Sequence, residues 1–317
     1  AARSFVLFGR PIVPALLAAL SDPRRPLRQA ALEGILRIEP DEHASEAKLL
    51  RGLTTPDQDH QAIWALSRLD GPSKVAVLAL AGMARDSQYR YPHFAADALG
   101  RIGRGAITAV PALLAVVADG GRGQRGNVAV ALTEIAPQDE RVVEALVRAH
   151  DDDLAAGRGD SAHEMLVDAI GKLGPAARAA VPSLIADLEK GQGAVRGKAA
   201  WALGAIGPDA AGGHEAVAAV AALIGALRSG DEDLVAHAAN ALLAFGAAAV
   251  PLLVETTTLD INAGQPAIDY VRAALQAGCH AVTANKGPAA FAFEELSALA
   301  GDRDASFLFE GAVMDGV

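Results

Sequence analysis

The sequence has a shortage of positive charge and a single cysteine. Its 317 residues carry 28 Lys and Arg against 38 Asp and Glu, a net charge of −10. Because a nucleic-acid-binding surface neutralises phosphates with clustered Lys and Arg, we expect no nucleic-acid partner. Cys279 has no second cysteine in the chain with which to form a disulfide, so nothing indicates an oxidising compartment. We therefore expect a cytoplasmic protein.

Aromatic residues and long uninterrupted apolar runs are also scarce. The run at 241–254 contains Pro251 and is shorter than the about 20 residues of a membrane-spanning helix, so we expect no membrane partner. Hydrophobic residues make up 51% of the chain but aromatic residues only 4%. Ala, Leu, Val and Ile therefore supply the apolar surface, which favours packed helices over an all-β fold.

One pattern recurs through the first 250 residues and defines a reference column. Apolar residues stand two positions before this column, two after it and five after it. At about 100° per residue these three offsets share one stripe of a helix, so we expect the reference column to point away from the core. Its members lie about 31 to 39 residues apart, a period that marks a solenoid. The column consists of Glu33, Trp64, Asp97, Val130, Asp168, Trp201 and Asn240.

Other apolar helices precede these, and each unit is expected to be helix, turn, helix. Examples lie at 13–20, 110–117 and 181–188, each with Pro as its second residue, where the missing N–H costs nothing. Gly, Pro, Ser and Asp between the helices favour turns. These segments resemble the short, alanine-rich form of the HEAT family over residues ~9–250. The predicted fold class is mainly α, with a HEAT-like α-solenoid of about seven helical hairpins.

The resemblance implies a scaffold that binds a protein partner on the concave face of the solenoid. Exposed tryptophans flanked by polar groups are typical binding anchors. Alternatively, the two tryptophans of the column lie under a neighbouring helix and merely pack. The predicted partner-binding residues are Trp64, Asp97, Asp168, Trp201 and Asn240.

Three further features of the repeats are interpreted as structural. The motif GRGQRG at 121–126 matches a phosphate-binding pattern, but the repeat register runs through it, which favours an inter-helix turn. The acidic stretch 150–160 lacks the ligand spacing of an EF-hand loop and is interpreted as a solvated insertion. The 8 histidines are scattered along the sequence without a zinc-type spacing, so no histidine metal site is expected.

After Pro251 the pattern changes to alternating strands and helices. Such alternation indicates parallel β/α units, so we expect two domains, a repeat solenoid at 1–250 and an α/β segment at 251–317. The expected strands are 251–258, 280–286 and 305–313, and the expected helices are 265–279 and 292–302.

The motifs ETTTLD, DYVRAAL, VTANKGP and FLFEGAVMDG follow one another within 255–317. They closely resemble part of the Rossmann-like nucleotide-binding domain of homoserine dehydrogenase. The resemblance implies hydride transfer between NADP or NAD and the aspartate-semialdehyde/homoserine pair. By the same resemblance, Thr256, Thr283, Asn285 and Lys286 bind the cofactor, with Lys286 nearest to the reacting carbon. A monovalent cation is implied at Glu310, Val313 and Asp315.

The rest of that family's pattern is not found. Its first strand and glycine-rich turn would precede ETTTLD, where a repeat unit stands, and its catalytic Asp and Lys would follow Val317. We therefore expect that the chain is not catalytically complete. Two functions stay open, namely an interaction scaffold or a fragment of a NAD(P)-dependent homoserine dehydrogenase of amino-acid biosynthesis. The join is expected to be a natural fusion, a truncated reading frame or an artificial join of two genes.

Overall fold

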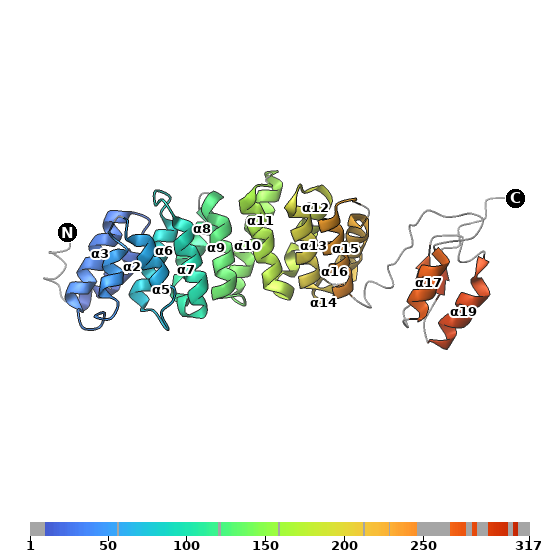
Figure 1. Cartoon of the computed structure of the whole chain (residues 1–317), viewed down its shortest axis with the longest axis horizontal. Coiled ribbons are helices and arrows are strands. Elements are labelled where there is room, and N and C mark those ends of the chain that lie inside the picture. The colour runs from blue at the N-terminus through green and yellow to red at the C-terminus, as the bar shows by residue number, and fades with distance from the viewer. Residues whose placement is uncertain are drawn as a thin grey trace. The chain divides into compact units, whose positions relative to one another are not determined.

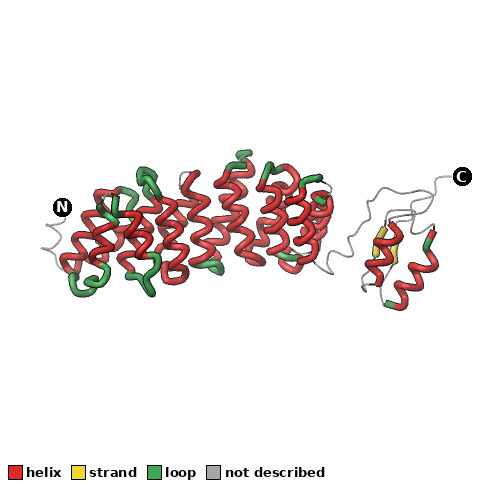
Figure 2. Tube along the Cα trace, in the orientation of Figure 1, coloured by secondary structure: helices red, strands yellow, loops and turns green. Residues whose placement is uncertain are grey.

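The computed structural model of the chain is mainly helical, as the composition predicted (Figure 2). The chain divides into two compact units, 1–202 and 203–317. The domain boundary expected near residue 250 lies outside the described residues. The structure describes residues 10–55, 57–119, 122–157, 159–211, 213–227, 229–245, 267–276, 281–283, 291–303 and 307–309.

The first unit is a succession of short helices (Figure 1). Several begin with Pro in the first turn, among them the predicted helices at 13–20 and 181–188. The helices are η2 (Arg10–Ile12), α2 (Val13–Leu20), α3 (Arg25–Ile38), α4 (Ala47–Gly52), α5 (Asp59–Leu66), α6 (Lys74–Arg85), α7 (Pro92–Ile102), η3 (Gly103–Ala109), α8 (Val110–Asp119), α9 (Arg122–Ile135), α10 (Glu140–Ala155), α11 (Ser161–Leu173), η4 (Gly174–Ala180), α12 (Val181–Lys190) and α13 (Ala194–Ile206), which continues into the second unit.

These helices form hairpins that pack in two layers. The pairs α2–α3, α6–α7, α8–α9 and α10–α11 each pack together. In one layer, α2, α6, α8, α10 and α12 contact one another in that order, and in the other α5 contacts α7, α7 contacts α9 and α9 contacts α11. The unit at α4 and α5 departs from this pattern, because α4 packs mainly on α3 and α5 while α6 contacts α2 directly.

The predicted apolar stripe faces the core of these layers. The positions two residues after the reference column are buried in the first unit, as at Leu66, Leu99 and Leu132. The column itself is exposed or half-buried. The prediction that Leu69 faces the core is wrong, because Leu69 is exposed. The reason is that α5 ends at Leu66, so the helical register on which the prediction rested does not reach Leu69.

Glycines in this unit allow neighbouring helices to pack closely, and the segment 121–126 is not the turn that was predicted. Helix α9 begins at Arg122, so most of the predicted inter-helix turn is helical, and that prediction is wrong. A Cβ added at Gly126 would lie 2.9 Å from the Cβ of Met165 on α11. Likewise, a Cβ at Gly100 on α7 would lie 3.3 Å from the Cα of Ala131 on α9. Only a small residue allows the backbones this close.

Buried ion pairs join the hairpins, and we call them the inter-hairpin ion pairs. In each, a basic residue near the start of a second helix contacts an Asp at or near the end of a first helix of another hairpin. Each basic residue stands five positions before the reference column. The pairs are Arg28–Asp86 at 2.7 Å, Arg125–Asp153 at 2.9 Å and His163–Asp187 at 3.1 Å.

The second unit contains a further helical hairpin and an α/β segment. Helix α14 (Pro208–Ala211) precedes the packed pair α15 (Gly213–Ala226) and α16 (Glu232–Phe245). Then follow α17 (Ala267–Gln276), β1 (Ala281–Thr283), α19 (Phe293–Asp302) and β2 (Phe307–Phe309). These four lie within the helices and strands predicted there, and the strand expected at 251–258 lies outside the described residues.

The two strands pair in parallel, with Ala281 opposite Phe307. Helix α19 connects them, so β1, α19 and β2 form one parallel β/α/β crossover. Leu275 on α17 and Leu296 on α19 are fully buried in a small core of their own. Arg272 and Glu295 bridge the same two helices through two contacts of 2.5 and 3.1 Å.

One stretch, Pro92–Asp119, is apolar and long enough to cross a membrane by length and composition alone. It consists of α7, η3 and α8, which follow one another through Gly103, whose φ is 61°. Its Leu99 and Leu113 are fully buried among neighbouring helices. We therefore interpret this stretch as part of the core.

Replacing Gly82 on α6 by Ala tests the close packing of the first layer. The added Cβ would lie 2.1 Å from the carbonyl oxygen of Leu20 and 2.4 Å from Cδ of Arg28, so backbone has to shift. We expect the free energy of unfolding, measured by urea denaturation, to fall by about 1–3 kcal/mol. Gly225→Ala is the control, because its Cβ meets nothing within 4 Å and Ala favours a helix by about 1 kcal/mol. Equal losses at both sites would contradict the packing.

Candidate functional site

Trp64 and Phe94 form the aromatic wall of a groove in the first unit. Trp64 on α5 is 61% exposed and Phe94 on α7 is 44% exposed. Both line a groove of about 740 Å³ that also includes residues of α4. Exposed apolar side chains that lie together and are bordered by polar residues often mark an interaction site. The groove is therefore the candidate site.

The departure of α4 and α5 from the layer pattern shapes this groove. Helix α4 has 6 residues and α5 has 8. A Cβ added at Gly52 would lie 2.9 Å from the Cβ of Ala62, so α4 packs tightly on one side of α5. Trp64, two residues further along the helix, points to another side. Short helices and this tight contact together leave the indole without a covering neighbour.

The charged side chains around the groove are mainly basic. The guanidinium of Arg68 lies 5.0 Å from the centre of the Trp64 ring, a cation–π contact. Asp97 and Arg101 form an exposed ion pair at 2.9 Å, so their charges offset each other. Lys48 also lines the groove. Among the lining residues, the positive charge of Lys48 is therefore not offset by a carboxylate, and Arg68, which does not line the groove, adds positive charge at the Trp64 ring.

Asp168 and Trp201 of the predicted partner-binding residues do not line this groove. Asp168 on α11 is half-buried and contacts Lys172 at 3.4 Å. Trp201 is 38% exposed, and a Cβ added at Gly171 on α11 would lie 2.2 Å from its ring. Its indole thus packs on the glycine backbone, which fits the packing alternative. Asn240 is exposed on α16 of the second unit. The structure brings together Trp64 and Asp97 alone.

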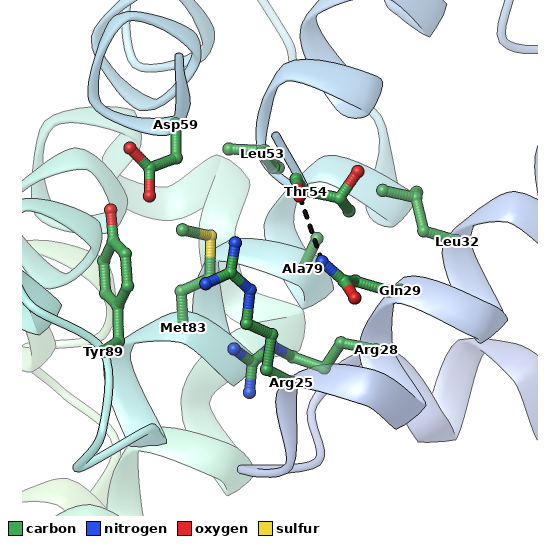
Figure 3. A pocket seen from close by; sticks show the side chains of 10 residues that line it. All are labelled: Arg25, Arg28, Gln29, Leu32, Leu53, Thr54, Asp59, Ala79, Met83 and Tyr89. Atoms are coloured by element: carbon green, nitrogen blue, oxygen red, sulfur yellow. Dashed lines mark hydrogen bonds between the residues drawn. The ribbon is translucent and has the colours of Figure 1, made fainter. Parts of the chain in front are cut away.

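A small cavity is lined by side chains of α3, α5 and α6, among others (Figure 3). Its volume is about 20 Å³, room for one water molecule and too little for a ligand. The Tyr89 hydroxyl faces the Asp59 carboxylate across it, and burial together with that negative charge raises the pKa of Tyr89. Gln29 donates a hydrogen bond to the Thr54 carbonyl oxygen at 3.0 Å. We interpret this cavity as a hydrated part of the core.

Two histidines that the sequence analysis set aside come together with Asp187 in the first unit. Helix α10 continues through residues 150–155, so the acidic stretch is not wholly a solvated insertion, and the scattered histidines do meet. His150 and His163 each place Nε2 beside the carboxylate of Asp187. All three are almost completely buried. One signal was present, because His163 stands five positions before the reference column, as Arg28 and Arg125 do.

The cofactor and cation residues inferred from the resemblance mostly lie outside the described part of the chain. Thr283 ends strand β1, the carboxyl end at which parallel sheets bind ligands. The structure describes its backbone but not its side chain. The predictions for these positions therefore stay predictions. The residues outside the described ranges are Thr256, Asn285, Lys286, Glu310, Val313 and Asp315.

Two crystal structures of engineered proteins are similar to parts of the chain. One matches with a TM-score of 0.44 and 21% identity, over 63% of this chain and 96% of its own. The other matches with a TM-score of 0.48 and 19% identity, over 92% of this chain and 83% of its own.

No protein-family model matches the chain. A stretch of 65 residues, 20% of the chain, is 43% identical to the NAD(+)-dependent homoserine dehydrogenase of Pseudomonas canavaninivorans and covers 18% of it. The homoserine dehydrogenase of Sulfurisphaera tokodaii is 32% identical over 65 residues, which are 20% of this chain and 21% of that protein. The chain thus spans about a fifth of the length of these curated relatives. Part of the chain is similar to homoserine dehydrogenases.

Proposed function

We propose that the helical hairpins form a HEAT-like solenoid that acts as a protein-interaction scaffold, with the groove at Trp64 as its binding site. The observation that carries this proposal is the indole of Trp64, 61% exposed beside Phe94 in a groove of about 740 Å³. Trp and Arg are the residues most often responsible for binding energy at protein interfaces. Here Arg68 and Trp64 are already stacked in a geometry that a partner could cover.

The chemistry of the groove favours one kind of partner. The aromatic wall suits an apolar side chain, and Lys48 with Arg68 suits a carboxylate next to it. The chain as a whole has a net charge of −10, so a basic groove is a local feature that steers an acidic segment to this place. We propose that the partner supplies an apolar residue flanked by Asp or Glu.

Trp64→Ala tests this proposal in a protein whose second tryptophan has been replaced. The chain has 2 tryptophans, so Trp201→Phe leaves Trp64 as the only indole reporter and keeps a ring on Gly171. A phage-displayed library of peptides with acidic residues around an apolar one supplies the probe. We expect selected peptides to shift the Trp64 fluorescence to shorter wavelength, and Trp64→Ala to weaken binding at least about tenfold, measured by calorimetry.

Ile107→Ala is the matched control, because Ile107 is also an exposed apolar residue of the first unit but does not line the groove. We expect it to bind peptide like the parent protein. Equal affinity of the Trp64→Ala and parent proteins would contradict the proposal. So would an equal loss of affinity in the control.

A second function is supported by the similarity to homoserine dehydrogenases. We propose that segment 255–317 is derived from the nucleotide-binding domain of such an enzyme, Rossmann-like in fold and built to meet NAD or NADP at the carboxyl end of β1. The identity of 43% over 65 residues and the parallel pairing of β1 with β2 support this proposal. Hydride transfer to aspartate semialdehyde is the activity that a complete domain would carry.

We expect the chain of 317 residues to produce no NADH or NADPH from L-homoserine with either cofactor, because it matches only about a fifth of the relatives. The measurement is the absorbance of reduced cofactor over time, with a curated relative such as the Pseudomonas canavaninivorans enzyme as positive control. Turnover by the chain that Lys286→Ala abolishes would contradict this expectation and show a working site.

A further inference from the structure

Asp187 is a buried carboxylate without a permanent positive charge beside it. In the other two inter-hairpin ion pairs the partner of the Asp is an arginine, which is always charged. Here His163 of α11 takes that position, and His150 of α10 joins it. The three residues come from α10, α11 and α12, and none is more than 2% exposed. A buried carboxylate requires a cation near it.

The two imidazoles are arranged around that carboxylate. Nε2 of His150 lies 2.6 Å from Oδ2 of Asp187, and Nε2 of His163 lies 3.1 Å from both carboxylate oxygens. The rings are stacked, with centroids 5.0 Å apart and planes 12° apart. Both Nε2 atoms therefore point toward one small region bounded by the carboxylate. The three potential ligand atoms all lie within 4.8 Å of one another.

Charge also favours a cation in that region. Asp187 brings a carboxylate to the point where both Nε2 atoms meet. The neighbouring Asp153 already has Arg125 at 2.9 Å. Among the described residues, no Lys or Arg side chain contacts Asp187. Its ionisable partners in that part of the chain are thus the two imidazoles, which bind a metal ion in their neutral form.

We propose that His150, His163 and Asp187 bind a divalent transition metal, with Zn²⁺ as the best fit. Imidazole nitrogen suits zinc, and zinc also takes a carboxylate oxygen as a ligand. Bonds of about 2.0–2.1 Å at tetrahedral angles place ligand atoms about 3.3 Å apart. The observed separations of 2.6 and 3.1 Å require the carboxylate to withdraw by less than about 1 Å. The fourth position falls to the second Asp187 oxygen or to a water molecule.

Burial indicates a structural role for the metal. No open face of the cluster is left for a substrate, since all three side chains are almost fully enclosed. The metal joins α10 and α11 to α12. It would thus link two neighbouring hairpins, as the ion pair of Arg125 with Asp153 links the hairpin α8–α9 to the hairpin α10–α11. Because the ligands come from three helices, the metal binds the folded chain and stabilises it.

Metal loading of the full, tag-free chain tests the proposal. After treatment with a chelator and its removal, the protein is dialysed with ZnSO₄ or CoCl₂, and bound metal is counted by mass spectrometry. We expect one metal ion per chain, and the visible absorption of tetrahedral Co²⁺. With free zinc at a hundred times its dissociation constant, we expect the melting temperature to rise by about 5–10 °C. A wild-type chain that retains no zinc would overturn the proposal.

Variants locate the metal. Asp187→Asn keeps the size of the side chain and removes its charge, and we expect it and His163→Gln to lose the bound ion. His43→Gln is the matched control, because His43 belongs to a second, partly exposed group with Glu39 and Glu42 that could also hold a metal. Loss of zinc in the control alone would overturn the assignment. If the Asp187 variant does not fold, X-ray absorption of the zinc-loaded wild type decides, since two imidazole ligands are expected and any sulfur ligand contradicts the site.

Discussion

The architecture of the first unit depends on buried ion pairs between hairpins. The helices are held close by Ala, Gly and aliphatic residues, which fill space without directing one hairpin to a particular place on the next. Arg28–Asp86 and Arg125–Asp153 do direct it, because an unpaired buried charge is strongly unfavourable. A pair of this kind therefore permits one register between hairpins and penalises others. At His163–Asp187 the same position carries an ionisable imidazole, which opens it to a metal.

The proposed binding groove is a consequence of one irregular unit within this order. Helices α4 and α5 are short, and α6 contacts α2 directly. The indole of Trp64 is left exposed, whereas that of Trp201 packs on Gly171. Two tryptophans in the same sequence column thus have different surroundings. The proposed binding groove therefore lies at α4 and α5, where the helices depart from the regular packing of the other hairpins.

Periodicity in the sequence predicted the helices, the apolar stripe and the outward position of Trp64. It also predicted α17, β1, α19 and β2 from the alternation of strand and helix patterns. It did not predict the polar contacts of the core, because these join residues 58, 28 and 24 positions apart. A periodic pattern assigns a face to each residue but not a partner. The turn predicted at GRGQRG was wrong for a related reason. Gly126 lies in a helix and allows close contact with Met165, which a periodic pattern does not reveal.

A double-mutant cycle at Arg28 and Asp86 tests the role of the inter-hairpin ion pairs most directly. The free energy of unfolding is measured for Arg28→Met, Asp86→Leu and the double variant. Each single change leaves a buried charge without its partner, so we expect a loss of about 3–5 kcal/mol and a coupling energy above about 1 kcal/mol. Losses that add within about 0.5 kcal/mol would contradict the account and leave close packing alone to hold the hairpins.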